Sequence, residues 1–575
     1  MEIDDRAGAA RDRGDLADAL TGWREALELA KHIARTFGES QTIFENLSWA
    51  YGKVGNTQLK LGNLDDAREA QIEAVEFGRK ALATPGREAY FSAALAWQVR
   101  GLGDVEAARK ADDAAFEAYS EGVRLLRRVV QLADRDSGNL YDLGYVLLEL
   151  GKMAARLRRF DVAEAALREA VERAEEAAEH AFDRSNALDL QTYCLCSLGD
   201  AQRDSGAPAT AAATYSRAAE VGKSLAELAG GSLGALDRWF VALDRLGDAR
   251  LDCLDPEGAL DAHRQAAGVA RRGVEVSNGS VDALSALGGS LFGIGYTALK
   301  CDKTDEAVSA YRECVEVQRP IVALEPSGTS HRTRLATALR YLCDAETRAD
   351  HFDAARTAVE EALAILRGPI EDGEPAEVRA QLVASLIALA RLEDAAGNLD
   401  PARKAYEGAI AEDMASLESG VGAPDAVRSL ADSHLRRSSF ELSARCGDAA
   451  REHARKGTDL LVRVVDELGE DWFCLDSQLE MLESLGDQYQ DAGDTLASLQ
   501  LRRDWVDLHR WVARRDAPGV ETLEHLTSAL RQLVMELDSA GATSEAAERR
   551  DELTLVEARL KRVKVGQLPA DPVPT

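Results

Sequence analysis

The sequence predicts an all-α fold, an α-solenoid of about twelve helix-turn-helix repeats, from three periodic observations. The first is a small residue every 48 positions, with one residue lost between the eighth and ninth copies; these anchors are Ala19, Ala67, Ala115, Ala163, Ala211, Ala259, Ala307, Ala355, Ala402, Ala450, Ser498 and Ala546. The second is another small residue seven positions after nearly every anchor, such as Ala74 after Ala67. Residues seven apart lie on one face of a helix, so this face can approach a neighbouring helix closely.

The third observation is a pair of glycine positions upstream of the anchor. A glycine recurs twelve residues before many anchors, as Gly55 and Gly103, and another recurs five residues before, as Gly62 and Gly206. The later glycine marks the end of a helix and a turn of the chain. Each unit is therefore predicted to consist of helix A, a tight turn and helix B.

This arrangement of small residues resembles the tetratricopeptide repeat family. The residues that match the family's order and spacing are Tyr51, Gly55, Gly62, Ala67 and Ala74. The resemblance covers essentially the whole chain and implies a right-handed solenoid that binds its partner in a concave groove. The unit of 48 residues is longer than the family's usual unit of about 34 residues. Helices of about 20 residues, roughly 30 Å long, would account for the difference.

The periodicity predicts one continuous array instead of several separate domains. Residues 1–36 hold an incomplete first repeat or an N-terminal cap, which indicates either a fragment of a longer protein or a short substitute cap at residues 1–13. Residues 37–425 form the regular array. Residues 426–565 form divergent C-terminal repeats, in which Trp505 and Leu553 replace small residues. The Pro-rich residues 566–575 are expected to be disordered.

The composition narrows the possible partners and the cellular location. A net charge of −31 makes nucleic-acid binding unfavourable, because phosphate contacts require dense Lys and Arg. A protein or peptide partner is expected, and a basic one would complement this charge, although solubility alone also explains it. The N-terminus lacks the apolar core of a signal peptide, and no run approaches a membrane span. We therefore expect a cytoplasmic protein with no membrane segment.

Motifs for chemistry are missing from the sequence. The nine histidines never form HExxH or a pair four residues apart, and neither GxxxxGK[ST] nor GxSxG occurs. Metal ligands need convergent spacing, and a phosphate loop needs its glycine-rich turn. No catalytic, cofactor-binding or metal-binding residues are predicted, and the chain is not expected to be an enzyme.

The first candidate site is a row of aromatic residues eighteen positions before successive anchors: Trp49, Trp97, Tyr145 and Tyr193. We call this row the aromatic ladder. Helix-A residues at this position resemble those that line the groove of tetratricopeptide arrays, where large aromatic side chains are the usual anchors for a partner. The alternative is that they pack between helices as part of the core.

The second candidate site is an aspartate eleven residues before several anchors, at Asp104, Asp200, Asp248, Asp344 and Asp487. Repeated at one position, these carboxylates would form a negative stripe along the binding face. The alternative is a structural hydrogen bond to the next unit.

A third patch lies near the C-terminus, where Arg502, Arg503, Arg510, Arg514 and Arg515 interleave with Trp505 and Trp511. Such mixing can stack nucleotides. The favoured interpretation is that Trp505 fills space beside a divergent repeat and that the arginines form a solvated face.

Together these features predict a non-enzymatic scaffold that binds a peptide or protein partner. The alternative function is a sensor or regulatory segment of a larger bacterial signalling or defence protein that carries a protease or NTPase effector. An effector domain in the same protein, or an effector gene beside it, would distinguish the two. The identity of the partner and the oligomeric state are not encoded in any pattern of the sequence.

Overall fold

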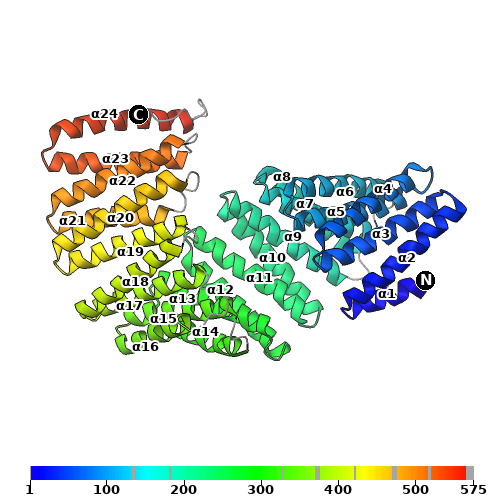
Figure 1. Cartoon of the computed structure of the whole chain (residues 1–575), viewed down its shortest axis with the longest axis horizontal. Coiled ribbons are helices and arrows are strands. Elements are labelled where there is room, and N and C mark those ends of the chain that lie inside the picture. The colour runs from blue at the N-terminus through cyan, green and yellow to red at the C-terminus, as the bar shows by residue number, and fades with distance from the viewer. Residues whose placement is uncertain are drawn as a thin grey trace. The chain divides into compact units, whose positions relative to one another are not determined.

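The structure is a computed structural model that describes residues 2–132, 136–180, 184–324, 328–368, 376–419, 423–468, 475–515 and 520–564. These residues form 24 α-helices and no β-strand (Figure 1). The helices follow one another as pairs of helix A and helix B, so the predicted all-α fold of about twelve helical repeats is confirmed.

The A helices are α1 (Glu2–Asp12), α3 (Gln41–Lys60), α5 (Glu88–Ala108), α7 (Ser137–Arg156), α9 (Arg184–Asp204), α11 (Leu233–Asp252), α13 (Val281–Lys300), α15 (Thr329–Arg348), α17 (Ala376–Ala395), α19 (Ala423–Ser443), α21 (Asp476–Asp491) and α23 (Val520–Ser539). The B helices are α2 (Leu16–Phe37), α4 (Leu64–Ala83), α6 (Asp112–Leu132), α8 (Phe160–His180), α10 (Pro208–Leu228), α12 (Pro256–Val276), α14 (Thr304–Leu324), α16 (Phe352–Leu366), α18 (Leu399–Ser419), α20 (Gly447–Leu468), α22 (Thr495–Arg515) and α24 (Thr543–Lys564). Most have the predicted length; α3 has 20 residues, α6 has 21 and α20 has 22.

The chain folds into two compact units, Met1–Lys303 and Thr304–Thr575. The first contains α1 to α13 and the second α14 to α24. In the first unit all successive helices pack on each other, and in the second unit nearly all of them do. A helices of successive pairs also touch, as α7 does with α9 and α9 with α11. Contacts between near neighbours in sequence are typical of repeat arrays.

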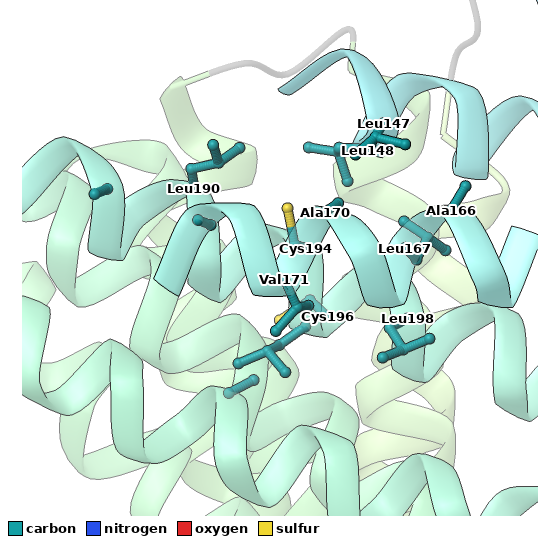
Figure 2. Close-up of a cluster of buried hydrophobic side chains, with 14 of the residues drawn as sticks. Leu147, Leu148, Ala166, Leu167, Ala170, Val171, Leu190, Cys194, Cys196 and Leu198 are labelled. Carbon is teal, nitrogen blue, oxygen red and sulfur yellow. The ribbon is translucent and has the colours of Figure 1, made fainter. Parts of the chain in front are cut away.

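The core explains why the anchors must be small. All twelve anchors are 0% exposed, because each lies where helix B meets the neighbouring helices. Around them, α7, α8 and α9 contribute the labelled buried side chains in Figure 2, among them Leu148, Leu167, Ala170 and Cys194. A larger residue at an anchor would push these close-packed helices apart.

The N-terminal segment has a short first helix. The 11-residue helix α1 packs on α2, and Ala7 of α1 lies against Gly22 of α2, where an added Cβ would come within 2.7 Å. The last ten residues, 566–575, lie outside the described part of the chain, so the expected disorder of this tail stays a prediction.

Candidate functional site: the A-helix face of the first unit

The aromatic ladder lies on four consecutive A helices, α3, α5, α7 and α9, of the first unit. Trp49 and Trp97 are 40% and 39% exposed. Tyr145 and Tyr193 are half-buried and pack against the apolar core. The two tryptophans of the ladder are therefore more exposed than its two tyrosines, which pack on the core and are only partly exposed. We call the surface around the ladder the A-helix face.

Cationic side chains lie over three rings of the ladder, those of Trp97, Tyr145 and Tyr193. The Arg100 guanidinium lies 4.4 Å from the centre of the Trp97 ring and 5.3 Å from that of Tyr145. The Tyr193 ring has two cations near it, Lys152 Nζ at 5.2 Å and the Arg238 guanidinium at 5.1 Å. Cation–π contacts of this kind hold the rings in place and put hydrogen-bond donors beside them.

The contacts between these cations and the ladder were not predicted from the sequence, although the spacing of one pair indicates such a contact. Arg100 follows Trp97 by three residues, a spacing that puts both on one helix face. Lys152, however, reaches Tyr193 from the preceding repeat and donates to its hydroxyl at 3.3 Å. No periodic pattern marks such a contact between repeats.

A cavity of about 190 Å³ opens beside the ladder, between α5, α6 and α7. Its polar lining residues are Trp97, Arg100, Tyr141, Asp142 and Tyr145, and its apolar ones are Ala96, Leu126 and Val146. Burial raises the pKa of Asp142 to about 6, although a hydrogen bond from Trp97 and the charge of Arg100 act in the opposite direction. The cavity therefore combines aromatic walls, one fixed cation and one weakly acidic carboxyl group.

A larger cavity of about 440 Å³ lies between α11, α12 and α13 of the same unit. We call it the α11–α13 pocket. It occupies the same place in its repeat as the smaller cavity, because Ala270 of the larger and Leu126 of the smaller each stand eleven residues after their anchors. The A-helix face is thus hollowed at equivalent places three repeats apart.

The five predicted aspartates all lie beside arginines. The shortest N–O distances are 3.8 Å for Arg100–Asp104, 2.6 Å for Arg245–Asp200, 3.6 Å for Arg203–Asp248 and 3.4 Å for Arg391–Asp344, and Arg502 also pairs with Asp487. Two of them also accept hydrogen bonds from buried tyrosines of their own repeat, Tyr119 to Asp104 at 2.9 Å and Tyr215 to Asp200 at 2.6 Å. Such pairing balances much of the negative charge that an acidic stripe would present.

The interpretation of the C-terminal arginines as a solvated face is wrong for Arg502. Its side chain is 0% exposed and pairs with Asp487 and Glu536. The reason is its position four residues after anchor Ser498, the place that Tyr119 and Tyr215 occupy in their repeats. Trp505 is 4% exposed and part of the core, as predicted. The side chains of Arg514 and Arg515 lie outside the described part of the chain.

Comparison with protein families gives one match: a model of the tetratricopeptide repeat matches residues 289–320. The matched segment runs from α13 into α14 and contains anchor Ala307. The chain therefore carries a tetratricopeptide repeat, and its helix pairs repeat the same pattern of small residues along the described chain. A comparison with curated protein sequences finds no match.

Several solved structures are similar to this chain at low identity. The apo form of RapI has 13% identity and a TM-score of 0.43, with 73% of this chain and 98% of that chain covered. Yeast Tom70 has 12% identity and a TM-score of 0.33, with 98% and 96% covered. A signal transduction ATPase with a tetratricopeptide repeat sensor from Pyrococcus horikoshii has 14% identity and a TM-score of 0.37, with 70% and 54% covered.

The described helices do not have the features of a membrane span. Within the described ranges, none of them combines the length and the apolar character that crossing a bilayer requires.

Proposed function

We propose that this chain is a non-enzymatic interaction scaffold and that the A-helix face of its first unit binds an extended segment of a protein partner. The helical-repeat fold is that of an interaction scaffold or sensor. The observation that carries the finer proposal is the aromatic ladder. Three of its rings, those of Trp97, Tyr145 and Tyr193, lie beside cations, and Trp97 and Tyr145 line a cavity.

The ladder suits an extended peptide for geometric reasons. Packed helices lie about 8 to 10 Å apart, and an extended chain advances about 3.3 Å per residue. Every third residue of such a peptide would therefore meet the next rung. Partly exposed Trp and Tyr side chains are the residue types that carry most of the binding free energy at protein interfaces.

The polar groups of the face suit a peptide backbone. Arg100, Lys152 and Arg238 project N–H donors beside the rings, and peptide carbonyls accept such hydrogen bonds. The net charge of −31 favours a neutral or basic partner over an acidic one. We therefore propose an apolar or mixed segment with few acidic residues.

The test begins with a random dodecapeptide library displayed on phage and selected on the immobilised full chain. Enriched peptides are synthesised, and their affinity for the chain is measured by fluorescence anisotropy. Trp97→Ala should weaken binding by about 2 kcal/mol or more, because it removes an interface anchor. Its melting temperature should fall by only a few degrees, because the side chain is already partly in solvent.

The matched control is Phe37→Ala, which removes a 78% exposed aromatic ring from the end of α2. It should leave peptide affinity unchanged. Full affinity in Trp97→Ala and Tyr145→Ala, with both variants folded, would exclude the ladder as the binding surface.

A further inference from the structure

The α11–α13 pocket differs from the smaller cavity in its chemistry. Its lining contains two carboxylates, Asp237 and Asp282, and no basic residue; the remaining lining residues are Leu233, Gly234, Leu236, Phe240, Val269, Ala270, Gly273, Ala283 and Ala286. The smaller cavity, in contrast, already contains the guanidinium of Arg100. The pocket is therefore an apolar hollow whose only charges are negative.

Residue size at equivalent positions explains why this pocket is larger. At the positions of Trp97 and Tyr145, the repeats around the pocket carry Val241 and Gly289. A Cβ added at Gly289 would meet no other atom within 4 Å. At the position of Arg100 stands Asp244, so the cation that partly fills the smaller cavity is replaced by an acid. The large side chains and the positive charge found at the smaller cavity are therefore missing at the equivalent positions around the α11–α13 pocket.

The carboxylates are not neutralised in the way that the other acids of this face are. Neither the Asp237 nor the Asp282 carboxylate forms a hydrogen bond or ion pair with the described residues, and both remain partly exposed to solvent. The adjacent Arg238 donates to Asp189 at 2.8 Å. Burial, together with the negative charges of Asp282 and Asp189, raises the pKa of Asp237, while Arg238 lowers it. A cation bound here would relieve this repulsion.

We propose that the α11–α13 pocket binds a Lys or Arg side chain of the partner segment, with its aliphatic stem against the apolar wall and its cationic group beside Asp237 and Asp282. This inference rests on the proposed function, because the pocket lies on the same A-helix face, between the A helices one and two repeats beyond Tyr193. The volume of about 440 Å³ lies within the range of about 300 to 1,000 Å³ that is typical of ligand pockets. Long basic side chains bury their stems in this way while the charged end reaches polar groups.

A partner that occupies this pocket carries a basic residue next to apolar ones. Peptides selected on the full chain from the dodecapeptide library should therefore contain a Lys or Arg beside apolar residues. Asp237→Asn and Asp282→Asn together should weaken their binding about tenfold or more, since charge-assisted hydrogen bonds are lost. Ala286→Phe, which fills the pocket from its wall, should weaken it similarly.

Two measurements separate this effect from unfolding or general charge. Asp302→Asn removes one exposed acid beyond the other end of α13 and should change affinity less than twofold. Asp237→Lys should restore binding to a peptide whose basic residue is replaced by Glu, which a misfolded protein would not do.

The outcomes distinguish the two proposals. The selected peptides could bind Trp97→Ala more weakly but bind the double Asn variant with full affinity, or they could contain no basic residue. Either result would overturn the proposal that the pocket binds a basic side chain, and would leave the proposed function intact. A library that yields no peptide specific for the chain over an unrelated helical protein would overturn both.

Discussion

Four residues after the anchor, one side chain of helix B fills the space that a glycine leaves in helix A. A Cβ added to Gly103 would come within 2.6 Å of the Tyr119 ring, and one added to Gly199 within 2.5 Å of Tyr215. In another repeat Leu167 fills the space beside Gly151. This close approach explains a glycine in mid-helix, where it costs about 1 kcal/mol relative to alanine.

The turn between the two helices also requires a particular backbone. The residue five positions before every anchor has a positive φ, between 55° and 84°, and glycine occupies six of these twelve positions. The other six are non-glycine residues, among them Leu254 with φ 58°. The left-handed conformation costs an ordinary residue about 1 kcal/mol or more.

Replacing Leu254 should therefore stabilise the protein. The Leu254 side chain is 90% exposed, so Leu254→Gly loses little packing and relieves the strained backbone. We expect a gain of about 0.5 to 1 kcal/mol, after the entropy cost of glycine is subtracted. Urea unfolding followed by circular dichroism measures it, and the reverse change at Gly206, Gly206→Leu, should destabilise. A stability loss in Leu254→Gly would contradict the explanation.

At the scale of the helix, ion pairs link the B helix of one repeat to the A helix of the next. The Glu carboxylates of these pairs are buried: Glu346 and Glu441 are 1% exposed, and Glu393 is 7% exposed in its side chain. Arg403 donates to both carboxylate oxygens of Glu441 at 2.9 Å. A second series joins successive B helices nearer the surface, as Arg79 does with Glu121 at 2.7 Å.

The two series should differ in their contribution to stability. Arg403→Met removes a positive charge that compensates the buried Glu441 carboxylate, and we expect the free energy of unfolding to fall by about 3 kcal/mol. Arg79→Met, the matched change in the outer series, should cost less than about 1 kcal/mol. Denaturant unfolding of both variants measures the difference, and equal losses would show that burial of the carboxylate does not decide the cost.

Helices α19 and α20 share a histidine pair, in which His434 is buried and His453 is partly buried. The Nδ1 atoms of His434 and His453 lie 2.8 Å apart, so one neutral ring donates to the other. Burial, as the largest cause, lowers the pKa of both to about 4. Nearby cations, Lys456 and Arg437, act in the same direction.

This pair predicts a loss of stability in acid. Between about pH 6.5 and pH 4 the unfolded chain binds protons that the folded pair excludes, so the free energy of unfolding falls as the pH drops through this window. One imidazole with a pKa lowered this far contributes up to about 3 kcal/mol. Thermal melts at pH 7 and pH 5 should differ less in a His434→Gln, His453→Gln double variant than in the parent chain. The control is His32→Gln on the exposed side of α2, and identical pH profiles for parent and double variant would contradict the prediction.

At the scale of the whole molecule, each unit is built from contacts between helices that are close in sequence. Such arrays gain stability from neighbours on both sides, and terminal repeats have a neighbour on one side only. In the first unit the largest buried cluster spans α5 to α12 and centres on α7, α8 and α9. At the two ends of the chain, α1 packs on α2 and α24 on α23.

Hydrogen exchange should follow this distribution. We expect the slowest amide exchange in α7 to α10 and the fastest in α1 and α24, because local opening requires least energy where contacts are fewest. Exchange followed by mass spectrometry of peptic fragments measures it along the whole chain. Uniform protection from α1 to α24 would mean that the chain unfolds as one cooperative body.

The sequence by itself determined the repeating elements of this protein. Anchors such as Ala115, the glycines that admit Tyr119 and Tyr215, and the turn positions all depend on spacing within one repeat, and a periodic chain displays that spacing directly. The aromatic ladder also followed from the period, because residues 48 apart take equivalent places on successive helices.

Only the tertiary structure decided which side chains meet and where space is left. The cations over Trp97 and Tyr193, the burial of Arg502 between Asp487 and Glu536, and the open α11–α13 pocket depend on the size and charge of residues in neighbouring repeats. The division into two compact units at Lys303 has no counterpart in the spacing of the anchors, which continues unchanged through Ala307. Periodicity assigns each residue to a face of its helix, but the partner across that face is set by packing between helices, which the spacing of residues along the chain does not contain.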